Sequence, residues 1–379
     1  MNTSSAFVDT VTSPKEAWLY TPVEEVNARS DAATPAERSG AQVSLADVNR
    51  LAGQYDGPRL VFVNGFFAAE LSRLDELPAG LVAGDRDDVA FVAAGDGVRC
   101  DIPVHVVHVA APADGSPDGV IAHPHTIIEL GRNSRAAVIE TYCGLDGSTV
   151  TDASTAISIG EGAELDQCRV QVESSTALHI GDTRIEQGTG SRLRHCSITV
   201  GADIGRNAIT VQLDAPDATT ELTGANITGR RQRHDTTVTV DHAASHCNSN
   251  QRFVGVVDDH GRGSFSGAII VRPGTVATDA HQSNRNLVLD PNAEADTRPW
   301  LNILADDVRC THGATVGRLD DDALFYLRSR GIAVADARTM LIEAFIRDIV
   351  DAIEQPLLRE HVTAVVDTII AGTTARNPS

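Results

Sequence analysis

Short β-rich runs recur through the middle of the chain, from about Val104 to Leu304, and they limit the fold more than any other feature. Examples are IIELGRNSRAAVI, ISIGEGAELDQCRV and SITVGADIGRNAITV, which share apolar residues, a glycine and a few small or polar residues before the next strand begins. Turn residues separate the runs, and no long helical pattern interrupts them. Such a repeat is typical of stacked coils in which each rung buries its face on the next. The sequence therefore predicts a mainly β protein with a right-handed parallel β-helix core; a β-sandwich with about as many strands is the alternative.

The chain before this core mixes helical and strand patterns. VSLADVNRLAGQY, from Val43, has a serine cap and helical apolar spacing, and RLVFVNGFF indicates a strand that ends at Gly65. A second helix is expected over Ala69–Leu77, and a further strand in DVAFVAA near residue 90. The segment Asn27–Gln42 is rich in Pro, Ala and Ser and is expected to be a linker or loop.

The end of the chain has a helical pattern. Asp320 is a good N-cap, acidic residues in the first turn complement the helix dipole, and Gly331 ends this helix. A second helix with one apolar stripe is expected over about Ala335–Glu354, and Pro356 opens a last helix that Gly372 stops. The sequence thus divides into a mixed N-terminal region (1–98), the β-helix core (99–305) and a C-terminal helical domain (306–379).

Charge and lysine content exclude several classes of function. The formal net charge of −21 disfavours nucleic acid and anionic membrane surfaces as partners, because both attract basic proteins. Lys15 is the only lysine and no Gly-rich phosphate loop surrounds it, so neither Walker-type ATP hydrolysis nor Schiff-base chemistry is expected.

The lack of a recognisable secretory signal and the scattered cysteines lead us to expect a cytoplasmic protein. The N-terminus, MNTSSAFVDTVTSP, lacks the charged start and apolar core of a secretory signal, and no apolar run approaches the length of a membrane span. The six cysteines are scattered singly without a CxxC pair, which favours a reducing compartment over a disulfide framework.

Cys310 and His312 are the strongest candidates for chemistry. They lie two residues apart in what is expected to be a short polar turn before the capped helix, and both side chains are soft enough to bind iron or zinc. If the segment is extended, both project to one face. Two ligands do not complete a metal site, so a cluster here needs ligands from another chain or is bound transiently. The alternative is a turn cysteine beside a hydrogen-bonded histidine.

Three other histidine-containing clusters favour structural roles, because no third ligand lies nearby or because such residues mostly satisfy backbone groups in turns. They are His123 with His125, His242 with His246 and Cys247, and the run HQSNRN from His281, which is expected to be a polar turn or an Asn/Gln ladder.

Ordered segments along most of the chain carry a resemblance to a known family. They are KEAWLYTP, RLVFVNGFFAAELSRL, HPHTIIEL, AVIETYCG, DHAASHCNSNQRFVGVV, GSFSGAIIVRPG, HQSNRNLVLDPNAEADTRPWLNI and DDVRCTHGATVGRLDDDALFYLRSRGI. Together they resemble the SufB/SufD family of iron–sulfur cluster assembly scaffolds, with a weaker match before residue 100. SufB members carry a cysteine where Ala293 stands here, and no cysteine lies between Cys247 and Cys310, so the chain is more similar to the SufD branch.

This resemblance implies a scaffold subunit without catalytic activity of its own. It implies a β-helix that pairs with SufB, C-terminal helices that dock the SufC ATPase, and a transient nascent cluster at the SufB–SufD interface, where His312 and Cys310 would act. The partner-binding residues expected on the C-terminal helices are Asp320, Leu324, Tyr326, Leu327, Arg330 and Phe345. Reduced flavin in the complex, a homodimer of the isolated chain and special roles for His246 or Cys247 stay open.

Two rival classes also use β-helices. A polysaccharide lyase or hydrolase would need a groove with aromatic residues for sugar stacking and a secretory signal, whereas aromatic residues make up only 4% of this chain. A simple β-helical binding module, or a homodimer that acts without SufB, is the second rival, and the solution mass would separate it from the scaffold hypothesis.

Overall fold

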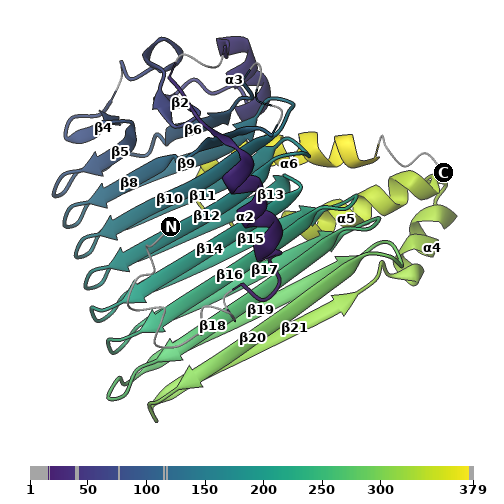
Figure 1. The fold of residues 1–379 in the computed structure, drawn as a ribbon. Coiled ribbons are helices and arrows are strands. Elements are labelled where there is room, and N and C mark those ends of the chain that lie inside the picture. Colours follow the sequence, from purple (N-terminus) through teal and green to yellow (C-terminus); the bar gives the residue numbers. More distant parts are fainter. Residues whose placement is uncertain are drawn as a thin grey trace.

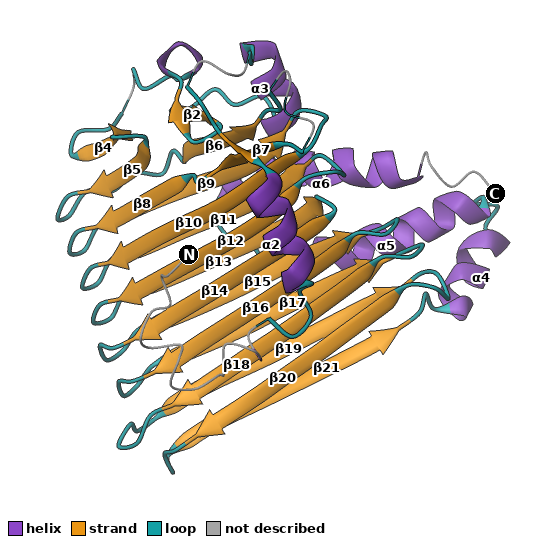
Figure 2. Ribbon diagram, in the orientation of Figure 1, coloured by secondary structure: helices purple, strands orange, loops and turns teal. Residues whose placement is uncertain are grey.

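The computed structural model of the chain describes residues 16, 18–38, 42–75, 77–113, 116 and 118–374. Two long sheets of parallel strands lie face to face and form a β-helix, with helices at its N-terminal end and along its sides (Figure 1). Figure 2 shows how strongly strands dominate this architecture. The predicted parallel β-helix is confirmed, and the sandwich alternative is wrong.

Sheet A holds the even-numbered strands of the coils, with β5 and β4 at its N-terminal end. Its members are β20 (Glu294–Ile303), β18 (Arg262–Val271), β16 (Arg233–His242), β14 (Ile204–Leu213), β12 (Leu178–Gln187), β10 (Thr149–Ile159), β8 (His125–Leu130), β5 (Val89–Ala94) and β4 (Leu81–Arg86). Two short strands, β1 (Thr34–Pro35) and β7 (Val120–Ala122), join its edge, where β7 also pairs with β10.

Sheet B holds the odd-numbered strands of the coils. Its members are β21 (Val308–Gly317), β19 (Thr278–Val288), β17 (Asn248–Val257), β15 (Thr219–Thr228), β13 (Arg192–Gly201), β11 (Glu164–Glu173), β9 (Arg135–Gly144), β6 (Val104–Ala110), β2 (Arg59–Val63) and β3 (Phe66–Phe67). Every pairing between successive coils is parallel, so the chain climbs one rung each time it passes through both sheets. Alternate side chains then point into the interior, which buries Leu165, Leu193 and Leu222 in one column-like core.

One corner of the coil recurs with the same backbone conformation. Gly162, Gly190, Asp217, His246 and Ala277 occupy it in successive coils, with φ between 53° and 64°. The backbone N–H of Gly162 donates to Thr189 O at 2.8 Å, and that of His246 donates to Val276 O at 2.9 Å, so each corner hydrogen-bonds to the coil above it. The recurring glycines seen in the sequence thus mark a turn that needs a left-handed residue, and other residue types also fill it.

The helices are α2 (Val23–Ala32), α3 (Leu45–Ala52), the 3-10 turn η2 (Ala69–Leu71), α4 (Asp321–Ser329), α5 (Val334–Val350) and α6 (Pro356–Thr374). Most of the helices lie on the outer faces of the sheets, whereas α4 packs on α5. Val26 of α2 packs on sheet A, while α5 and α6 bury Ile346, Ile349, Leu358 and Val362 on sheet B. No helix of the described residues is both long and apolar enough to cross a membrane.

Several predicted elements are confirmed, among them α3 with its Ser44 cap and the helix that Asp320 caps. The linker expected over Asn27–Gln42 is wrong at its start, because α2 continues to Ala32. The helix expected over Ala69–Leu77 is only the 3-10 turn η2, and α6 runs past Gly372 to Thr374. The N-terminal segment 1–14 and Lys15 lie outside the described residues.

Candidate functional site

Cys310 and His312 lie on a strand and not in the polar turn that was expected. Both belong to β21, which pairs in parallel with β19 and is the last strand of sheet B. The pairing sets Cys310 beside Ala280 and His312 beside Gln282. Because residues two apart on a strand share a face, the two candidate ligands project in the same direction.

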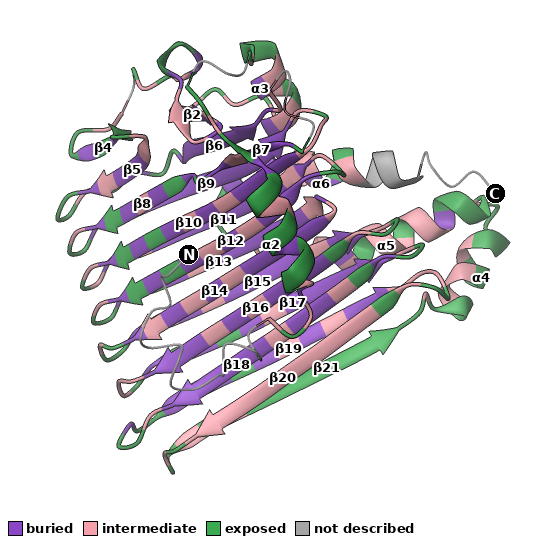
Figure 3. Cartoon of the chain, viewed as in Figure 1, coloured by how far each residue is buried: buried purple, intermediate pink, exposed green. Residues whose placement is uncertain are grey.

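That direction is the interior of the β-helix. Ala280 and Gln282 are buried inside the coil below, so the residues stacked on them face the same interior one rung further on. Cys310 packs with Leu301 and Ile303 of β20, whereas His312 is exposed. Figure 3 shows β20 mostly half-buried and β21 mostly exposed, unlike the strands before them. The two side chains are therefore core positions of a coil that nothing among the described residues covers.

The last coil also has open backbone edges. β20 and β21 stand at the ends of their sheets, so the outer N–H and C=O groups of each strand have no strand partner among the described residues. Such an edge is a template on which another strand can pair.

Burial, and secondarily the Asp279 carboxylate, raise the pKa of the Cys310 thiol. The thiol is consequently protonated at neutral pH, and binding of a metal must displace its proton.

The outer face of the same strands carries a separate polar triad. His281 Nε2 lies 2.7 Å from Asp279 Oδ1, and His281 Nδ1 lies 2.7 Å from Thr311 Oγ1. These side chains alternate with Cys310 and Gln282, so they face away from the candidate ligands. The run from His281 is a strand, β19, and its inward residues form the expected ladder: Gln282 Nε2–H donates to Gln251 Oε1 at 2.7 Å.

The remaining histidine clusters have protein partners. His123 Nδ1 lies 3.1 Å from Asp152 Oδ2, and His242 Nε2 lies 2.8 Å from Ser249 Oγ. His246 occupies a corner of the coil, while the buried Cys247 thiol donates to Ala215 O at 3.3 Å. No group of three or more His, Cys, Asp or Glu side chains that could hold a metal ion occurs in the described part of the chain.

The expected partner-binding residues lie on and around α4. Asp320 accepts hydrogen bonds from the N–H groups of Asp322 and Ala323, and Arg330 donates to Tyr326 Oη at 2.8 Å. Leu324 and Leu327 are half-buried. Phe345 of α5 is also half-buried, with the guanidinium of Arg285 5.4 Å from its ring centroid, so it faces the β-helix.

Phe325, the most exposed aromatic side chain of this surface, was not among the predicted partner-binding residues. Phe325 is 73% exposed and Tyr326 is 56% exposed, and no residue of α4 is fully buried. The signal for Phe325 was present in the stretch ALFYLRSR, in which apolar residues go all the way round a short helix. A solvent-facing pair of aromatic side chains is unusual on a free surface and typical of an interaction site.

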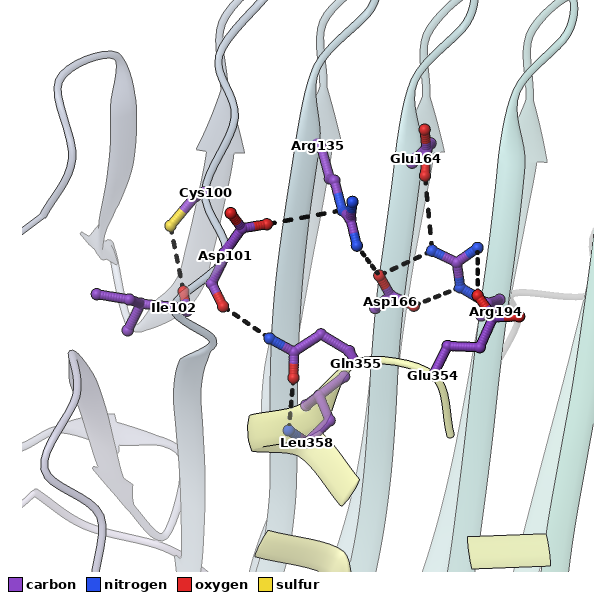
Figure 4. Close-up of polar contacts among 10 residues, drawn as sticks. All are labelled: Cys100, Asp101, Ile102, Arg135, Glu164, Asp166, Arg194, Glu354, Gln355 and Leu358. Carbon is purple, nitrogen blue, oxygen red and sulfur yellow. Dashed lines mark hydrogen bonds and ion pairs between the residues drawn. The ribbon is translucent and has the colours of Figure 1, made fainter. Parts of the chain in front are cut away.

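The turn between α5 and α6 is anchored to the β-helix by a charged cluster (Figure 4). Arg194 Nε on β13 lies 2.6 Å from Asp166 Oδ1 on β11. Arg194 Nη1 lies 3.4 Å from Glu354 Oε2 in the turn. Two further ion pairs extend the cluster: Glu164 Oε2 lies 3.6 Å from Arg194 Nη2, and Arg135 Nη2 lies 3.7 Å from Asp166 Oδ2. Asp166 is buried, so a carboxylate of sheet B lies sealed beneath the turn between the C-terminal helices.

Gln355 makes a second anchor beside the first (Figure 4). Its Nε2–H donates to Asp101 O at 2.7 Å, in the segment just before β6. Its Oε1 accepts from the backbone N–H of Leu358 at 2.6 Å and so caps the start of α6. The C-terminal helices and the first coils of sheet B are thereby tied together.

The sequence of the chain is similar to those of known proteins. Residues 113–345 match the family described as "SUF system FeS cluster assembly, SufBD core domain". The chain is 30% identical to the iron–sulfur cluster assembly protein SufD of Escherichia coli, over 94% of this chain and 88% of that protein. It is also 30% identical to a SufBD family protein of Synechocystis, over 89% of this chain and 83% of the relative. The chloroplastic protein ABCI7 of Arabidopsis thaliana is similar at 26% identity, over 72% of this chain and 59% of its own length.

Proposed function

Because the chain belongs to the SufBD family of iron–sulfur cluster assembly proteins as a homologue of SufD, we propose that it is a scaffold subunit of a cytoplasmic SUF complex. In this proposal it pairs with a SufB subunit through the last coil of the β-helix and helps to form a nascent cluster at their interface. The iron and sulfide of that cluster are the scaffold's cargo and not a resident cofactor.

The uncovered last coil is the observation that carries the proposal. Its strand edges suit pairing with another β-helix by strand addition. A coil of the partner placed on β20 and β21 would enclose Cys310 and His312 between the two chains. Two ligands leave an iron site incomplete, and a partner seated there would supply the others.

The C-terminal helices support the docking of an ATPase subunit of the SufC type. The exposed Phe325 and Tyr326 of α4 are the kind of aromatic anchors that dominate protein interfaces. The anchors of the α5–α6 turn on β11 and β13 give a mechanical route from these helices to the coils. Nucleotide-driven movement of such an ATPase would then pull on the helices and shift the interface near His312, while ATP hydrolysis belongs to the partner.

The family membership favours this function over the polysaccharide-acting enzyme that a β-helix alone would also allow. Solution mass tests the partnership directly. We expect the chain, mixed with a cognate SufB and SufC, to give a complex of one SufB, two SufC and one copy of this chain in light scattering. A mixture that stays as separate species would contradict the proposed pairing.

Substitution of the exposed ligand tests the site. We expect His312→Ala to lower the yield of clusters formed on the complex about tenfold, as loss of groups around metal ligands commonly does. The melting temperature should hardly change, because His312 is exposed and packs on no buried core. His260→Ala, at another exposed histidine, is the matched control. Full cluster yield with His312→Ala would remove His312 from the mechanism.

A further inference from the structure

We propose that Gln282 is a positioning residue for His312: its side-chain oxygen accepts the imidazole N–H and leaves the other ring nitrogen free for iron. This inference rests on the proposed function, in which His312 meets iron at the interface. It concerns a residue of the coil below, which is buried and cannot reach the interface itself.

Gln282, the strand partner of His312 in the coil below, has an unused acceptor. The two residues are partners in the parallel pairing of β19 with β21, and neighbouring strands lie about 4.8 Å apart. Gln282 is only 3% exposed, and its Nε2–H is committed to Gln251 Oε1 at 2.7 Å. Its Oε1 is buried and has no hydrogen-bond partner among the described residues. An unsatisfied buried carbonyl is costly and rare, which marks it as a group that awaits a donor.

Packing holds the Gln282 amide in this place. Gly267 of sheet A faces the amide across the interior, and a Cβ at Gly267 would collide with Gln282 Nε2. Gly267 belongs to β18, and in the neighbouring strand β20 it is paired with Pro299. The glycine therefore leaves room for a polar amide just beneath the last coil, two residues along β19 from Ala280 in the apolar cluster that contains Cys310.

Covering the last coil would create the need for this acceptor. While His312 is exposed, water satisfies both ring nitrogens. A partner chain that encloses the imidazole removes that water, and the N–H must then find a protein acceptor or pay a desolvation penalty. Metal-binding histidines almost always donate their second N–H to such a group, which fixes the tautomer and the orientation of the ring. Gln282 Oε1 is a buried, unpartnered oxygen on the residue that pairs with His312 in the coil below.

Two substitutions at Gln282 separate acceptor chemistry from packing. Gln282→Met keeps the length and removes the acceptor, whereas Gln282→Glu keeps an acceptor at the same place. In the assembled complex we expect Gln282→Met to lower cluster yield about tenfold and Gln282→Glu to retain most of it. Thr297→Val is the matched control, because the Thr297 hydroxyl also lacks a partner but lies on the opposite sheet. Light scattering must show the same assembly for each variant, and equal losses with Met, Glu and Val would overturn the proposal.

A second measurement reads the tautomer without cluster formation. The ring nitrogens of His312 can be followed by nitrogen-15 NMR in complexes that carry labelled histidine only in this chain, with His312→Ala to assign the signals. We expect one tautomer in the native complex and a mixture of tautomers in Gln282→Met. If His312→Ala abolishes clusters while Gln282→Met changes neither tautomer nor yield, the proposed function stands and the role of Gln282 is wrong. If Gln282→Met alters the tautomer but His312→Ala leaves the yield unchanged, the proposed function fails instead.

Discussion

At the scale of single residues, position in the coil decides the role of each side chain. His246 and Cys247 are neighbours in the sequence, yet His246 turns a corner with φ of 62° while Cys247 is buried. Cys310 and His312 occupy interior positions like those of Ala280 and Gln282 but are less buried, because no further coil covers them within the described residues. Whether a side chain in this protein can act as a ligand thus depends on which coil it belongs to and on whether it faces the interior or the outside of the β-helix.

The corner at Ala277 offers a test at this scale. Ala277 has φ of 53°, in the left-handed region that suits glycine, as Gly162 and Gly190 show at the equivalent corners. We expect Ala277→Gly to raise the free energy of unfolding by about 0.5–1 kcal/mol, since the relief of strain exceeds the entropy that glycine adds to the unfolded chain. Urea unfolding measures the change, with Ala305→Gly, outside the left-handed region, as the control. A loss of stability at Ala277 comparable to the control would refute the strain argument.

At the scale of elements, the β-helix supplies a rigid column and the C-terminal helices are attached to its side. The apolar contact of α5 and α6 with sheet B is broad, and the Arg194 cluster adds a directional tie at their connecting turn. The two ends of this arrangement differ: α4 has no fully buried residue, whereas Gln355 and Leu358 at the start of α6 are buried. The C-terminal helices are therefore fixed to the β-helix at the turn between α5 and α6 and exposed to solvent at α4.

Removing Arg194, the central cation of the charged cluster, should weaken this attachment. Arg194→Ala leaves the buried Asp166 with only the more distant Arg135 at 3.7 Å. Because breaking a buried ion pair strands a charge, we expect a loss of about 3 kcal/mol in the free energy of unfolding. Glu354 is the matched control: its side chain is 64% exposed, so Glu354→Gln should cost less than about 1 kcal/mol. Equal stability of Arg194→Ala and the native chain in urea unfolding would show that the helices need no such tie.

At the scale of the whole molecule, the interior of the coils and the contact with the helices bury an unusual number of histidines. Burial lowers the pKa of His108 and His195 to about 3, and that of His234, His242 and His361 to about 4. In the unfolded chain these groups titrate near 6.5. The folded protein thus keeps neutral several side chains that the unfolded chain would protonate.

This difference predicts acid sensitivity. Below about pH 6.5 the unfolded state binds more protons than the folded state, so stability is lost as the pH falls toward 4, by about 1.4 kcal/mol per pH unit for each such histidine. Urea unfolding at pH 7, 6 and 5 measures the slope. His195→Gln should reduce it, since a buried imidazole with a lowered pKa is removed. A slope that is flat between pH 7 and 5 would contradict the prediction.

The sequence by itself determined the coil, its helical end and the family. Repeated apolar runs, the Asp320 cap and the ordered motifs are local patterns, and local patterns predict local structure and descent. The tertiary structure alone decided that Cys310 and His312 lie on an uncovered strand facing the interior, that His246 serves a corner, and that Gln282 lies under His312. Those facts depend on the register between strands about thirty residues apart, in which a shift of one residue would turn every side chain to the other face, and no local pattern records that register.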